Sequence, residues 1–585
     1  MIQKTSLVAL ALGLVLVSGV SLSAGANERH PTYCNPLNVD YALVPDKDYS
    51  HNNNCHRSTA DPVCILYKDK YYLFATNQEG YWYSSDLLDW HFVSHFFKEN
   101  ASKDQVCAPA AWPTSKGVMF LPCMIKGDHI PLYLSTKPES GKWQELVSAF
   151  PITVWDPSIY EDDDKRLYIY WGSSNVYPIY GVELDPFDGY KPKGKPVELF
   201  KLDPAKHGWE QFGEDNQNGT MAPFIEGAWM NKFDGKYYLQ YGAPGTEWNV
   251  YGDGVYVSDK PLGPFEYQKY SPFSWKPTGF IRGAGHGNTF ADRYNNLWHA
   301  ATMDICVKNT FERRMGLFPS GVDKDGVLYA DTTFGDYPHY IAKGKRSGDD
   351  FTGWMLLSYR KPCWTLPAVG DKSLAFDEDI KTFWTAGDAA KDRFIAVDLQ
   401  EPCTIRAVQI NYADDQAKVF GKQLGKHHRY QVYVSDDKQK WDLLIDKSKC
   451  NKEVPHDYVE LDKPVVARYI KLVNIEMPTG NFAISDLRVF GHAPGNRPEP
   501  VQGFALERDD KDRRNIKFKW QAVPGAYAYN IRFGVAPDKL YNSMLIYDRT
   551  DYQLHSLNVD ASYYFQIESV NRAGVSAKSA IIAGR

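Results

Sequence analysis

Three acidic residues occupy equivalent places in separate segments of the chain, and they are the strongest candidates for chemistry. Asp61 lies in Ser-Thr-Ala-Asp-Pro, Asp156 in Thr-Val-Trp-Asp-Pro-Ser, and Glu226 in Ala-Pro-Phe-Ile-Glu-Gly-Ala. Carboxylates that share one site repel each other, so at least one pKa in such a site should rise. A protonated carboxyl beside an ionised one is the pairing that general acid and general base catalysis requires.

The local sequences suggest different roles for these acids. Glu226 is flanked by Phe224, Ile225, Gly227 and Ala228, and this apolar setting favours a protonated acid. The two Asp-Pro pairs fix the entry into a strand, because proline restricts its own backbone and that of the preceding residue. One Asp-Pro alone is common turn chemistry, whereas three acids in register within a repeat indicate function.

A degenerate repeat of strands and turns must position these residues. Successive segments begin at anchor positions separated by 47, 48, 66 and 63 residues, which are Asp61, Ala108, Asp156, Ala222 and Gly285. Turn signals such as Lys68-Asp69-Lys70 and Phe233-Asp234-Gly235 separate the strands. A repeated unit of this size predicts an all-β fold, a five-bladed β-propeller over residues 27–345, with the acids converging on its central channel.

The sequence pattern changes after the predicted propeller. Residues 361–492 resemble a discoidin or coagulation-factor type C jelly roll, the fold of family 32 carbohydrate-binding modules, on motifs such as Ala375-Phe376-Asp377 and Thr382-Phe383-Trp384. A Pro/Gly-rich linker from Gly491 to Pro500 indicates a boundary. Residues 501–585 resemble a fibronectin type III sandwich, in which alternating strands surround a buried Trp520, and we expect it to act as a spacer.

The surroundings of the three acids resemble glycoside hydrolase family 43 over about residues 31–340. The resemblance implies that Asp61 is the general base that activates water and that Glu226 is the general acid that protonates the leaving oxygen. Asp156 would raise the pKa of the acid and help to position it. The family inverts the anomeric centre, so the two working carboxyls should lie roughly 6.5–9.5 Å apart, with a water between them.

Three further residues are candidates for substrate binding. His286, in Gly-Ala-Gly-His-Gly-Asn, matches a blade-five histidine that the family places at the channel centre beside a water or a calcium. Arg313 or Arg314 matches a family arginine that contacts the acids or the sugar, and Arg314 is preferred. Trp112 forms either a wall of the sugar pocket or part of the core. No metal and no cofactor is required for the chemistry, although a structural calcium stays open.

Composition and the N-terminal residues limit the partners, the cysteine sites and the location that the protein can have. The net charge of −6 argues against a nucleic-acid partner. No C-x-x-C pair occurs among the nine cysteines, so neither a structural zinc site nor a thioredoxin-like site is indicated. Residues 1–26 are typical of a signal peptide, with Lys4, an apolar run and Ala24-Gly25-Ala26 as the cleavage site. We therefore expect an exported, periplasmic or extracellular protein that is not inserted in a membrane. We also expect a monomer, and the resemblance to family 43 implies an oligosaccharide or polysaccharide as its partner.

The first choice of activity is exo-acting release of a terminal furanose or pentose, with α-L-arabinofuranose ahead of the alternatives. A β-D-galactofuranosidase, a β-xylosidase and a galactan-active hydrolase remain open, as does a glycan-binding protein without catalysis. A fructan-processing propeller is disfavoured because its Trp-Met-Asn-Asp-Pro-Asn-Gly motif is absent. The insertion from Trp209 to Gly219, ahead of the acid, is expected to close one side of the pocket and favour exo-action.

Overall fold

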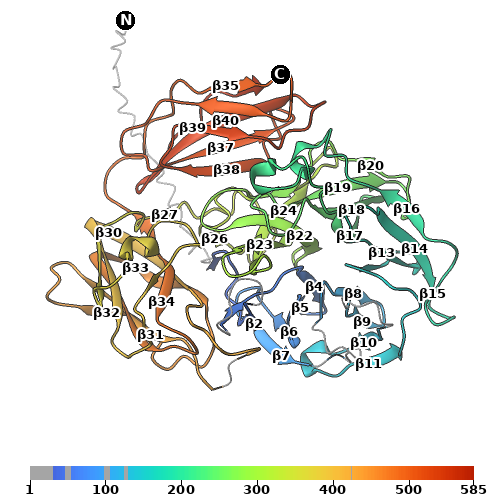
Figure 1. Cartoon of the computed structure of the whole chain (residues 1–585), viewed down its shortest axis with the longest axis horizontal. Coiled ribbons are helices and arrows are strands. Elements are labelled where there is room, and N and C mark those ends of the chain that lie inside the picture. Colours follow the sequence, from blue (N-terminus) through green and yellow to red (C-terminus); the bar gives the residue numbers. More distant parts are fainter. Residues whose placement is uncertain are drawn as a thin grey trace, which may run out of the picture.

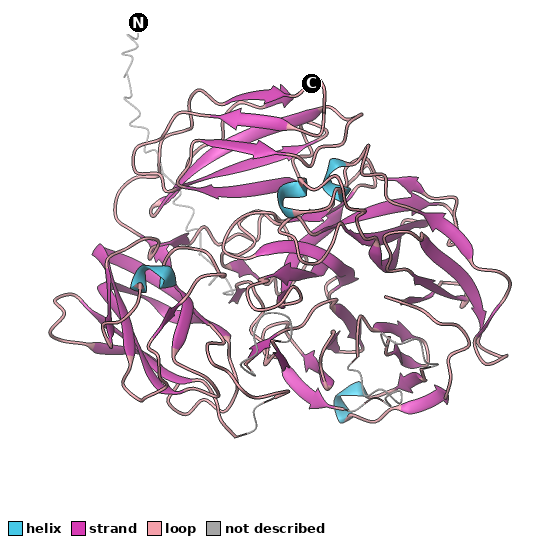
Figure 2. Cartoon of the chain, in the orientation of Figure 1, coloured by secondary structure: helices cyan, strands magenta, loops and turns pink. Residues whose placement is uncertain are grey.

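The computed structural model describes residues 31–46, 54–95, 97, 106–123, 130–422 and 425–584. The expected signal peptide lies outside the described residues. The described chain is built from β-strands, and its helical turns are short 3-10 segments: η1 (Pro138–Ser140), η2 (Gly208–Glu210), η3 (Glu214–Asn216) and η4 (Lys372–Ala375) (Figure 2). The all-β fold class predicted from the sequence is confirmed.

Five antiparallel sheets follow one another along the first part of the chain and form the blades of a propeller (Figure 1). The first two blades contain β4 (Val63–Tyr67), β5 (Lys70–Phe74), β6 (Gly80–Ser84) and β7 (His91–Ser94), then β8 (Ala110–Thr114), β9 (Gly117–Leu121), β10 (Leu132–Ser135) and β11 (Gln144–Val147). The third contains β12 (Ser158–Glu161), β13 (Leu167–Trp171), β14 (Ile179–Asp185), β15 (Lys191–Pro192) and β16 (Val197–Phe200).

The fourth blade contains β17 (Glu226–Phe233), β18 (Lys236–Ala243), β19 (Gly252–Ser258), β20 (Glu266–Tyr267) and β21 (Ser274–Trp275). The fifth contains β22 (Arg282–Ala291), β23 (Leu297–Asp304), β24 (Arg313–Val322) and β25 (Leu328–Ala330), and one parallel bridge between Gly252 and Ala284 joins it to the fourth. The first strands β4, β8, β12, β17 and β22 contact one another in a closed ring, which identifies them as the inner strands.

The turn signals in the sequence correspond to tight hairpins. Tyr67 pairs with Lys70 across a two-residue loop, and Phe233 pairs with Lys236 across Asp234-Gly235. Asp234 and Gly235 have φ values of 49° and 80°, which are the left-handed angles that a type I′ turn requires. These turns fix the register of the strands that follow, and therefore which residues face the neighbouring blades.

Aromatic and aliphatic side chains between the blades form the propeller core. Trp82 and Tyr71 of the first blade pack with Phe290 and Trp298 of the fifth, so the ring closes through hydrophobic contact between its ends. The short strand β1 (Thr32–Tyr33) pairs with β26 (His339–Tyr340) beside this closure. All nine cysteines of the chain are described and are free thiols.

The jelly roll follows the propeller and contacts it (Figure 1). Its sheet contains β27 (Met355–Leu356), β28 (Cys363–Leu366), β29 (Trp384–Thr385), β30 (Phe394–Tyr412), β31 (Arg429–Ser435), β32 (Asp442–Asp446), β33 (His456–Glu476) and β34 (Ala483–His492). Because β27 pairs with β34, this sheet begins before residue 361. A hairpin of β2 (Leu43–Pro45) and β3 (Cys55–Arg57) connects the propeller to the jelly roll through a bridge between Leu43 and Gly421.

The last part of the chain is a sandwich of two sheets. One contains β35 (Ala505–Arg508), β36 (Ile516–Lys519) and β39 (Asp551–Leu554); the other contains β37 (Ala528–Gly534), β38 (Asn542–Tyr547), β40 (Tyr563–Asn571), β41 (Gly574–Val575) and β42 (Ile582–Gly584). Val250 and Trp275 of the propeller belong to its hydrophobic core. The sandwich is thus packed on the propeller, and its expected role as a spacer stays a prediction. The likeness to fibronectin type III stays a prediction.

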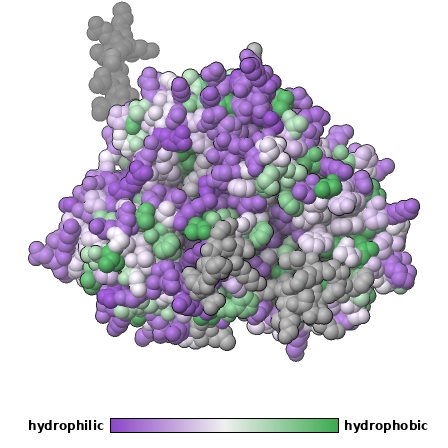
Figure 3. Space-filling view, in the orientation of Figure 1, coloured by the Kyte–Doolittle hydropathy of each residue, from purple (hydrophilic) through white to green (hydrophobic). Residues whose placement is uncertain are grey.

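The three parts meet at buried Arg488 of the jelly roll. Its guanidinium pairs with Glu378 at 2.7 Å and donates to the carbonyl oxygen of Asp336 in the propeller segment at 2.5 Å. Tyr547 of the sandwich donates to Glu378 at 3.1 Å. No helix in the described part of the chain has the length and apolarity needed to cross a membrane. Figure 3 shows hydrophilic residues over much of one face, with hydrophobic residues scattered among them.

Candidate active site

The inner strands share a backbone feature at the position of the acids. Asp61, Asp156 and His286 have φ values of 54°, 47° and 40°, and Ala108, the anchor of the second blade, has 39°. In the fourth blade the left-handed residue is Gly227, with φ of 66°, directly after Glu226. Non-glycine residues in this conformation are strained and gather at functional sites. The repeat therefore directs the side chains of four candidate residues, one from each of four blades, toward one point.

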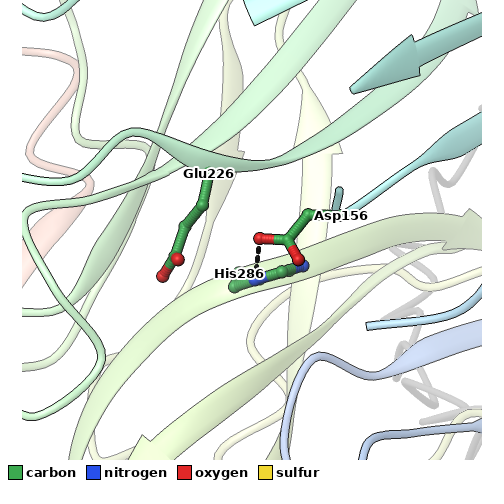
Figure 4. Close-up of side chains that lie close together, drawn as sticks. All are labelled: Asp156, Glu226 and His286. Carbon is green, nitrogen blue, oxygen red and sulfur yellow. Dashed lines mark ion pairs between the residues drawn. The ribbon is translucent and has the colours of Figure 1, made fainter. Parts of the chain in front are cut away.

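Asp156, Glu226 and His286 lie together at this point (Figure 4). One donor atom from each of the three lies within 4.8 Å of the others. The Nδ1 atom of His286 lies 3.9 Å from Oδ2 of Asp156 and 3.3 Å from Oδ1 of Asp61. The structure therefore brings together the four residues that the repeat singles out, although they come from different blades.

Asp61 is buried among groups that stabilise its ionised form. Burial raises its pKa, but the positive charges of His286 and Arg313 and a hydrogen bond from Thr76 outweigh this effect, so the pKa lies below its ordinary value. Thr76 donates its hydroxyl to Oδ2 at 2.5 Å, and Nη1 of Arg313 lies 3.7 Å from Oδ1. The backbone amide of Asp61 donates to Oγ1 of Thr302 at 2.8 Å. A carboxylate that stays ionised can accept a proton from water.

The surroundings of Asp156 raise its pKa, in contrast to those of Asp61. Burial raises its pKa, His286 lowers it, and the neighbouring charges of Glu226 and Asp61 raise it further, to about 7. The expected rise of a pKa among the three acids thus falls on Asp156. The charges of Glu226 and Asp61 thus favour the protonated form of Asp156.

Glu226 begins β17 and is only partly buried. Ser173 donates to Oε2 at 3.2 Å, and the buried hydroxyl of Tyr251 donates to Oε1 through a short hydrogen bond. Its apolar neighbour in sequence, Phe224, is 38% exposed. The carboxyl is therefore held by two hydroxyl donors, and the apolar enclosure expected from the sequence is not formed by Phe224.

His286 is placed among the acids by close backbone approach. A Cβ atom on Gly227 would lie 2.7 Å from Cγ and Cδ2 of the imidazole, and one on Gly242 would lie 3.0 Å from the amide nitrogen of His286. Burial lowers the pKa of His286, but Asp61, Asp156 and Glu226 raise it above its ordinary value. A protonated ring keeps the charges of the surrounding carboxylates in balance.

The donor set of Asp156, Glu226 and His286 could hold a metal ion. Ligation requires a neutral imidazole, however, and the acids around His286 favour its protonated form. The protonated ring and a cation would compete for the same carboxylates. The residues present therefore fit a cation only when His286 loses its proton.

The preference for Arg314 as the arginine of the site is wrong, because adjacent residues of a strand point to opposite faces. Arg313 contacts Asp61 and donates to Oγ1 of Thr246 at 3.0 Å. Arg314 points toward the jelly roll, where it donates to Nε2 of His456 at 2.8 Å. Arg313 is therefore the arginine beside the acids.

Trp112 lies among the inner strands of the propeller. Its ring centroid lies 5.2 Å from that of Tyr160 and 5.4 Å from that of Trp229, which belong to the third and fourth blades. It also packs against hydrophobic residues between the blades. These are contacts of a core tryptophan, so of the two expectations for Trp112 the structure supports packing.

Sequence reasoning missed several residues of the site. Thr76 and Tyr251 supply hydroxyls to Asp61 and Glu226, but each lies in a segment without a motif. Glu247 lies in the loop between β18 and β19; burial raises its pKa, and the charge of Glu226 adds to the rise. The positive φ of the residue after the acid could have been anticipated at Gly227, since glycine adopts it without strain.

The insertion ahead of the acid is held in place by the C-terminal sandwich. Arg514 donates to Oε1 of Gln211 at 2.7 Å, and Ser556 donates to Oδ1 of Asn216 at 2.5 Å. Within the propeller, Asn249 donates to Oδ1 of Asp215 at 2.8 Å. The insertion is thus fixed from both sides, next to the loop that contains Glu247.

Comparison with known proteins agrees with this organisation. Residues 52–327 match the glycosyl hydrolases family 43, and residues 363–486 match the F5/8 type C domain. A beta-xylosidase of Xylanibacter ruminicola is 29% identical over 161 residues, covering 24% of this chain and 48% of the relative. An arabinoxylan arabinofuranohydrolase of Paenibacillus polymyxa is 24% identical over 322 residues, covering 45% of this chain and 48% of the relative.

The matches thus span about half the length of these two relatives. A solved structure described as a glycoside hydrolase aligns with a TM-score of 0.43 and 18% identity, covering 76% of this chain and all of that one. On the family matches, residues 52–327 form a domain of the glycosyl hydrolases family 43, which is followed by an F5/8 type C domain over residues 363–486.

Proposed function

We propose that the protein hydrolyses glycosidic bonds with inversion at the anomeric carbon. Asp61 takes a proton from water, the water oxygen attacks the anomeric carbon, and Glu226 gives a proton to the departing oxygen as the glycosidic bond breaks. The products are a free sugar of inverted configuration and the alcohol of the leaving group. Asp61 ends protonated and Glu226 ionised, and exchange with solvent restores both.

The observation that carries this proposal is the electrostatic contrast within the cluster. His286, Arg313 and Thr76 keep Asp61 ionised, as a base requires. Burial and the neighbouring carboxylates raise the pKa of Asp156 to about 7, so the group retains a proton near neutral pH. Acid and base roles are assigned where environments push pKa values apart. Asp156 then serves as the neighbour that helps to position Glu226.

For the substrate, we propose a terminal α-L-arabinofuranose on an oligosaccharide or polysaccharide. The relatives are named for xylosidase and arabinofuranohydrolase activity, and another is named a beta-D-galactofuranosidase, from Aspergillus niger. A β-D-xyloside or a β-D-galactofuranoside is the alternative sugar. We expect the insertion, which Arg514 and Ser556 hold in place, to close one side of the pocket and so to favour exo-action.

For the remaining expectations, we propose that the protein is exported, acts as a monomer and needs no cofactor for the chemistry. The F5/8 type C domain supports a saccharide partner, since the sequence resembles carbohydrate-binding modules there.

The test is hydrolysis of aryl glycosides of α-L-arabinofuranose, β-D-xylose, β-D-galactofuranose and β-D-galactopyranose. We expect one of them to be cleaved by the wild type and left intact by Asp61→Asn and by Glu226→Gln, with thermal unfolding of both variants close to that of the wild type. Wild-type rates in either variant would contradict the assignment. If no glycoside and no branched glycan is cleaved, glycan binding without catalysis is the better description.

A further inference from the structure

A buried carboxylate of the jelly roll lies against the segment that leads to Asp61. Asp414 follows β30, and its side chain is 3% exposed. It forms an ion pair with the guanidinium of Arg57, which ends β3, and accepts a hydrogen bond from the amide of Arg57 at 2.8 Å. Arg57 stands four residues before Asp61. Asp414 therefore contacts the strand end from which the chain enters the active site.

The same carboxylate also reaches the strand that carries the arginine of the site. Oδ2 of Asp414 lies 3.5 Å from Nη2 of Arg314, whose Nε donates to Nε2 of His456 at 2.8 Å. His456 accepts at this nitrogen, and its Nδ1 lies 2.8 Å from Oδ1 of Asn411. Arg314 is fixed by two jelly-roll side chains, while the preceding residue, Arg313, points to Asp61.

The two contacted segments are also bonded to each other. Nη1 of Arg314 donates to the carbonyl oxygen of Arg57 at 2.5 Å. The amide of Thr59 donates to the carbonyl oxygen of Arg313, and the amide of Arg313 donates to Oγ of Ser58, both at 3.3 Å. A shift of either segment would therefore move the other, and with it the pair formed by Asp61 and Arg313.

The charges explain why a carboxylate is needed at this place. Arg57 and Arg314 are both buried, and each of their guanidinium groups pairs with Asp414. Lys308 donates to the backbone carbonyl of Asp414. Burial raises the pKa of Asp414, but Arg57, Arg314 and Lys308 outweigh burial and hold it far below its ordinary value. Burial and Arg314 lower the pKa of His456, so this residue is neutral. Without Asp414, the buried guanidinium of Arg314 would lose its acidic partner.

We propose that the jelly roll completes the catalytic site: Asp414, acting through Arg57 and Arg314, is a positioning residue that fixes Asp61 and Arg313 in their catalytic geometry. This inference rests on the proposed role of Asp61 as the base. It gives the F5/8 type C domain a part in catalysis on small substrates, in addition to any binding of polysaccharide.

The experiment compares Asp414→Asn with Asp40→Asn in the full chain. Asp40 is the matched control, because it pairs with Lys422 of the jelly roll across the same interface and otherwise accepts from Trp82. On the aryl glycoside that the wild type cleaves, we expect Asp414→Asn to lower kcat by about 10- to 100-fold, with KM within about twofold. The acidic limb of its pH profile should move upward, because Arg313 no longer stabilises ionised Asp61. Asp40→Asn should keep the wild-type kcat and pH profile.

Two further measurements separate positioning from stability. His456→Gln weakens the hold on Arg314 and leaves the ion pairs of Asp414 with Arg57 and Arg314 in place, so it should fold and lower kcat by less than Asp414→Asn does. Asp414→Asn should also cost less in an Arg313→Lys background than in the wild type, because residues that act through one another are not additive. Wild-type kcat and acidic limb in both folded variants, or full additivity with Arg313→Lys, would overturn the proposal.

Crystal structures give a result that does not depend on turnover. In Asp414→Asn, or in His456→Gln if the former does not fold, the Arg313 guanidinium should move away from Asp61, from which it lies 3.7 Å in the wild type. An unchanged contact would overturn the positioning role. If the wild type hydrolyses no glycoside while the variant shows this displacement, the proposed function fails and the positioning role stands.

Discussion

Replacing Thr76 by valine should move the acidic limit of activity while leaving neutral activity largely intact. The hydroxyl of Thr76 donates to Oδ2 of Asp61 at 2.5 Å and accepts from the amide of Ala108 at 2.7 Å. Valine has nearly the same shape and supplies neither interaction. The carboxylate of Asp61 would then keep its charged neighbours, His286 and Arg313, but lose the hydroxyl that donates to it.

The size of the effect follows from the energy of a hydrogen bond to a charged group. Such a bond contributes about 1.5–3 kcal/mol, and one pKa unit corresponds to about 1.36 kcal/mol. The pKa of Asp61 should therefore rise by about 1–2 units in Thr76→Val. The base must be ionised to work, so the acidic limb of the pH dependence of kcat/KM should move upward by the same amount.

The same substitution changes the pH dependence of stability. Asp61 has a folded pKa below its unfolded value, so its ionisation stabilises the fold above the unfolded pKa of about 3.9, and this contribution is lost as the pH falls through the folded pKa. Raising the folded pKa removes about 1.5–3 kcal/mol of the contribution at neutral pH. The unpaired amide of Ala108 should cost about 1–3 kcal/mol more, at every pH.

The assay is a pH profile of kcat/KM on the cleaved aryl glycoside, together with denaturant unfolding at pH 4 and pH 7. Thr76→Ser is the control, because it keeps the hydroxyl and should keep the wild-type limb. An acidic limb that coincides with that of the wild type in folded Thr76→Val would refute the reasoning. It would mean that the hydroxyl does not set the ionisation of Asp61.

Three other outcomes are expected. Gly227→Ala should lower the free energy of unfolding by about 1–3 kcal/mol more than Gly235→Ala in denaturant titrations. Both glycines have a positive φ, but only a methyl group at 227 would meet His286, at 2.7 Å. Equal losses in the two variants would contradict this close approach. Arg514→Ala should raise KM by about fivefold and leave kcat unchanged in steady-state kinetics, because it frees the insertion that we expect to close one side of the pocket; an unchanged KM would show that the insertion does not touch the substrate. A chelator should leave turnover unchanged, because neither proton transfer needs a metal; activity lost with the chelator and restored by calcium would contradict that expectation.

The all-β fold and the convergence of the acids could both be predicted from the sequence. Both depend on local patterns that repeat along the chain, and a repeated register position falls at the same place in every blade. Asp61 and Asp156 enter their strands with the same left-handed backbone, and His286 occupies the matching place in the fifth blade. No contact between distant residues has to be known for this inference.

The choice between Arg313 and Arg314 could not be made in the same way. Neighbouring strand residues face opposite sides, and a shift of register by one residue exchanges them. The register of β24 is set by pairing with β23 along its whole length, where Arg314 is opposite Met303 and Arg313 is opposite Asp304. A motif that contains both arginines gives no information about which of them faces the acids.

The contacts between the propeller, the jelly roll and the sandwich could not be predicted from the sequence either. Asp414, Arg488 and Arg514 lie more than 100 residues from their propeller partners, and each is an ordinary charged residue in its own segment. A charged residue in a single sequence is most often solvated. Only the packed structure shows that these three are buried or half-buried at interfaces, which is why the sandwich was expected to be a spacer.

The central claim is that Asp61 activates water for direct attack on the anomeric carbon. Time-resolved proton NMR of the first sugar released from the cleaved glycoside, recorded before mutarotation, tests this claim most directly. If Asp61 is the general base, the first anomer has the inverted configuration and Asp61→Asn releases none. A first anomer of retained configuration would show that a carboxylate attacks the sugar itself, and it would contradict the assignment of Asp61 as a general base.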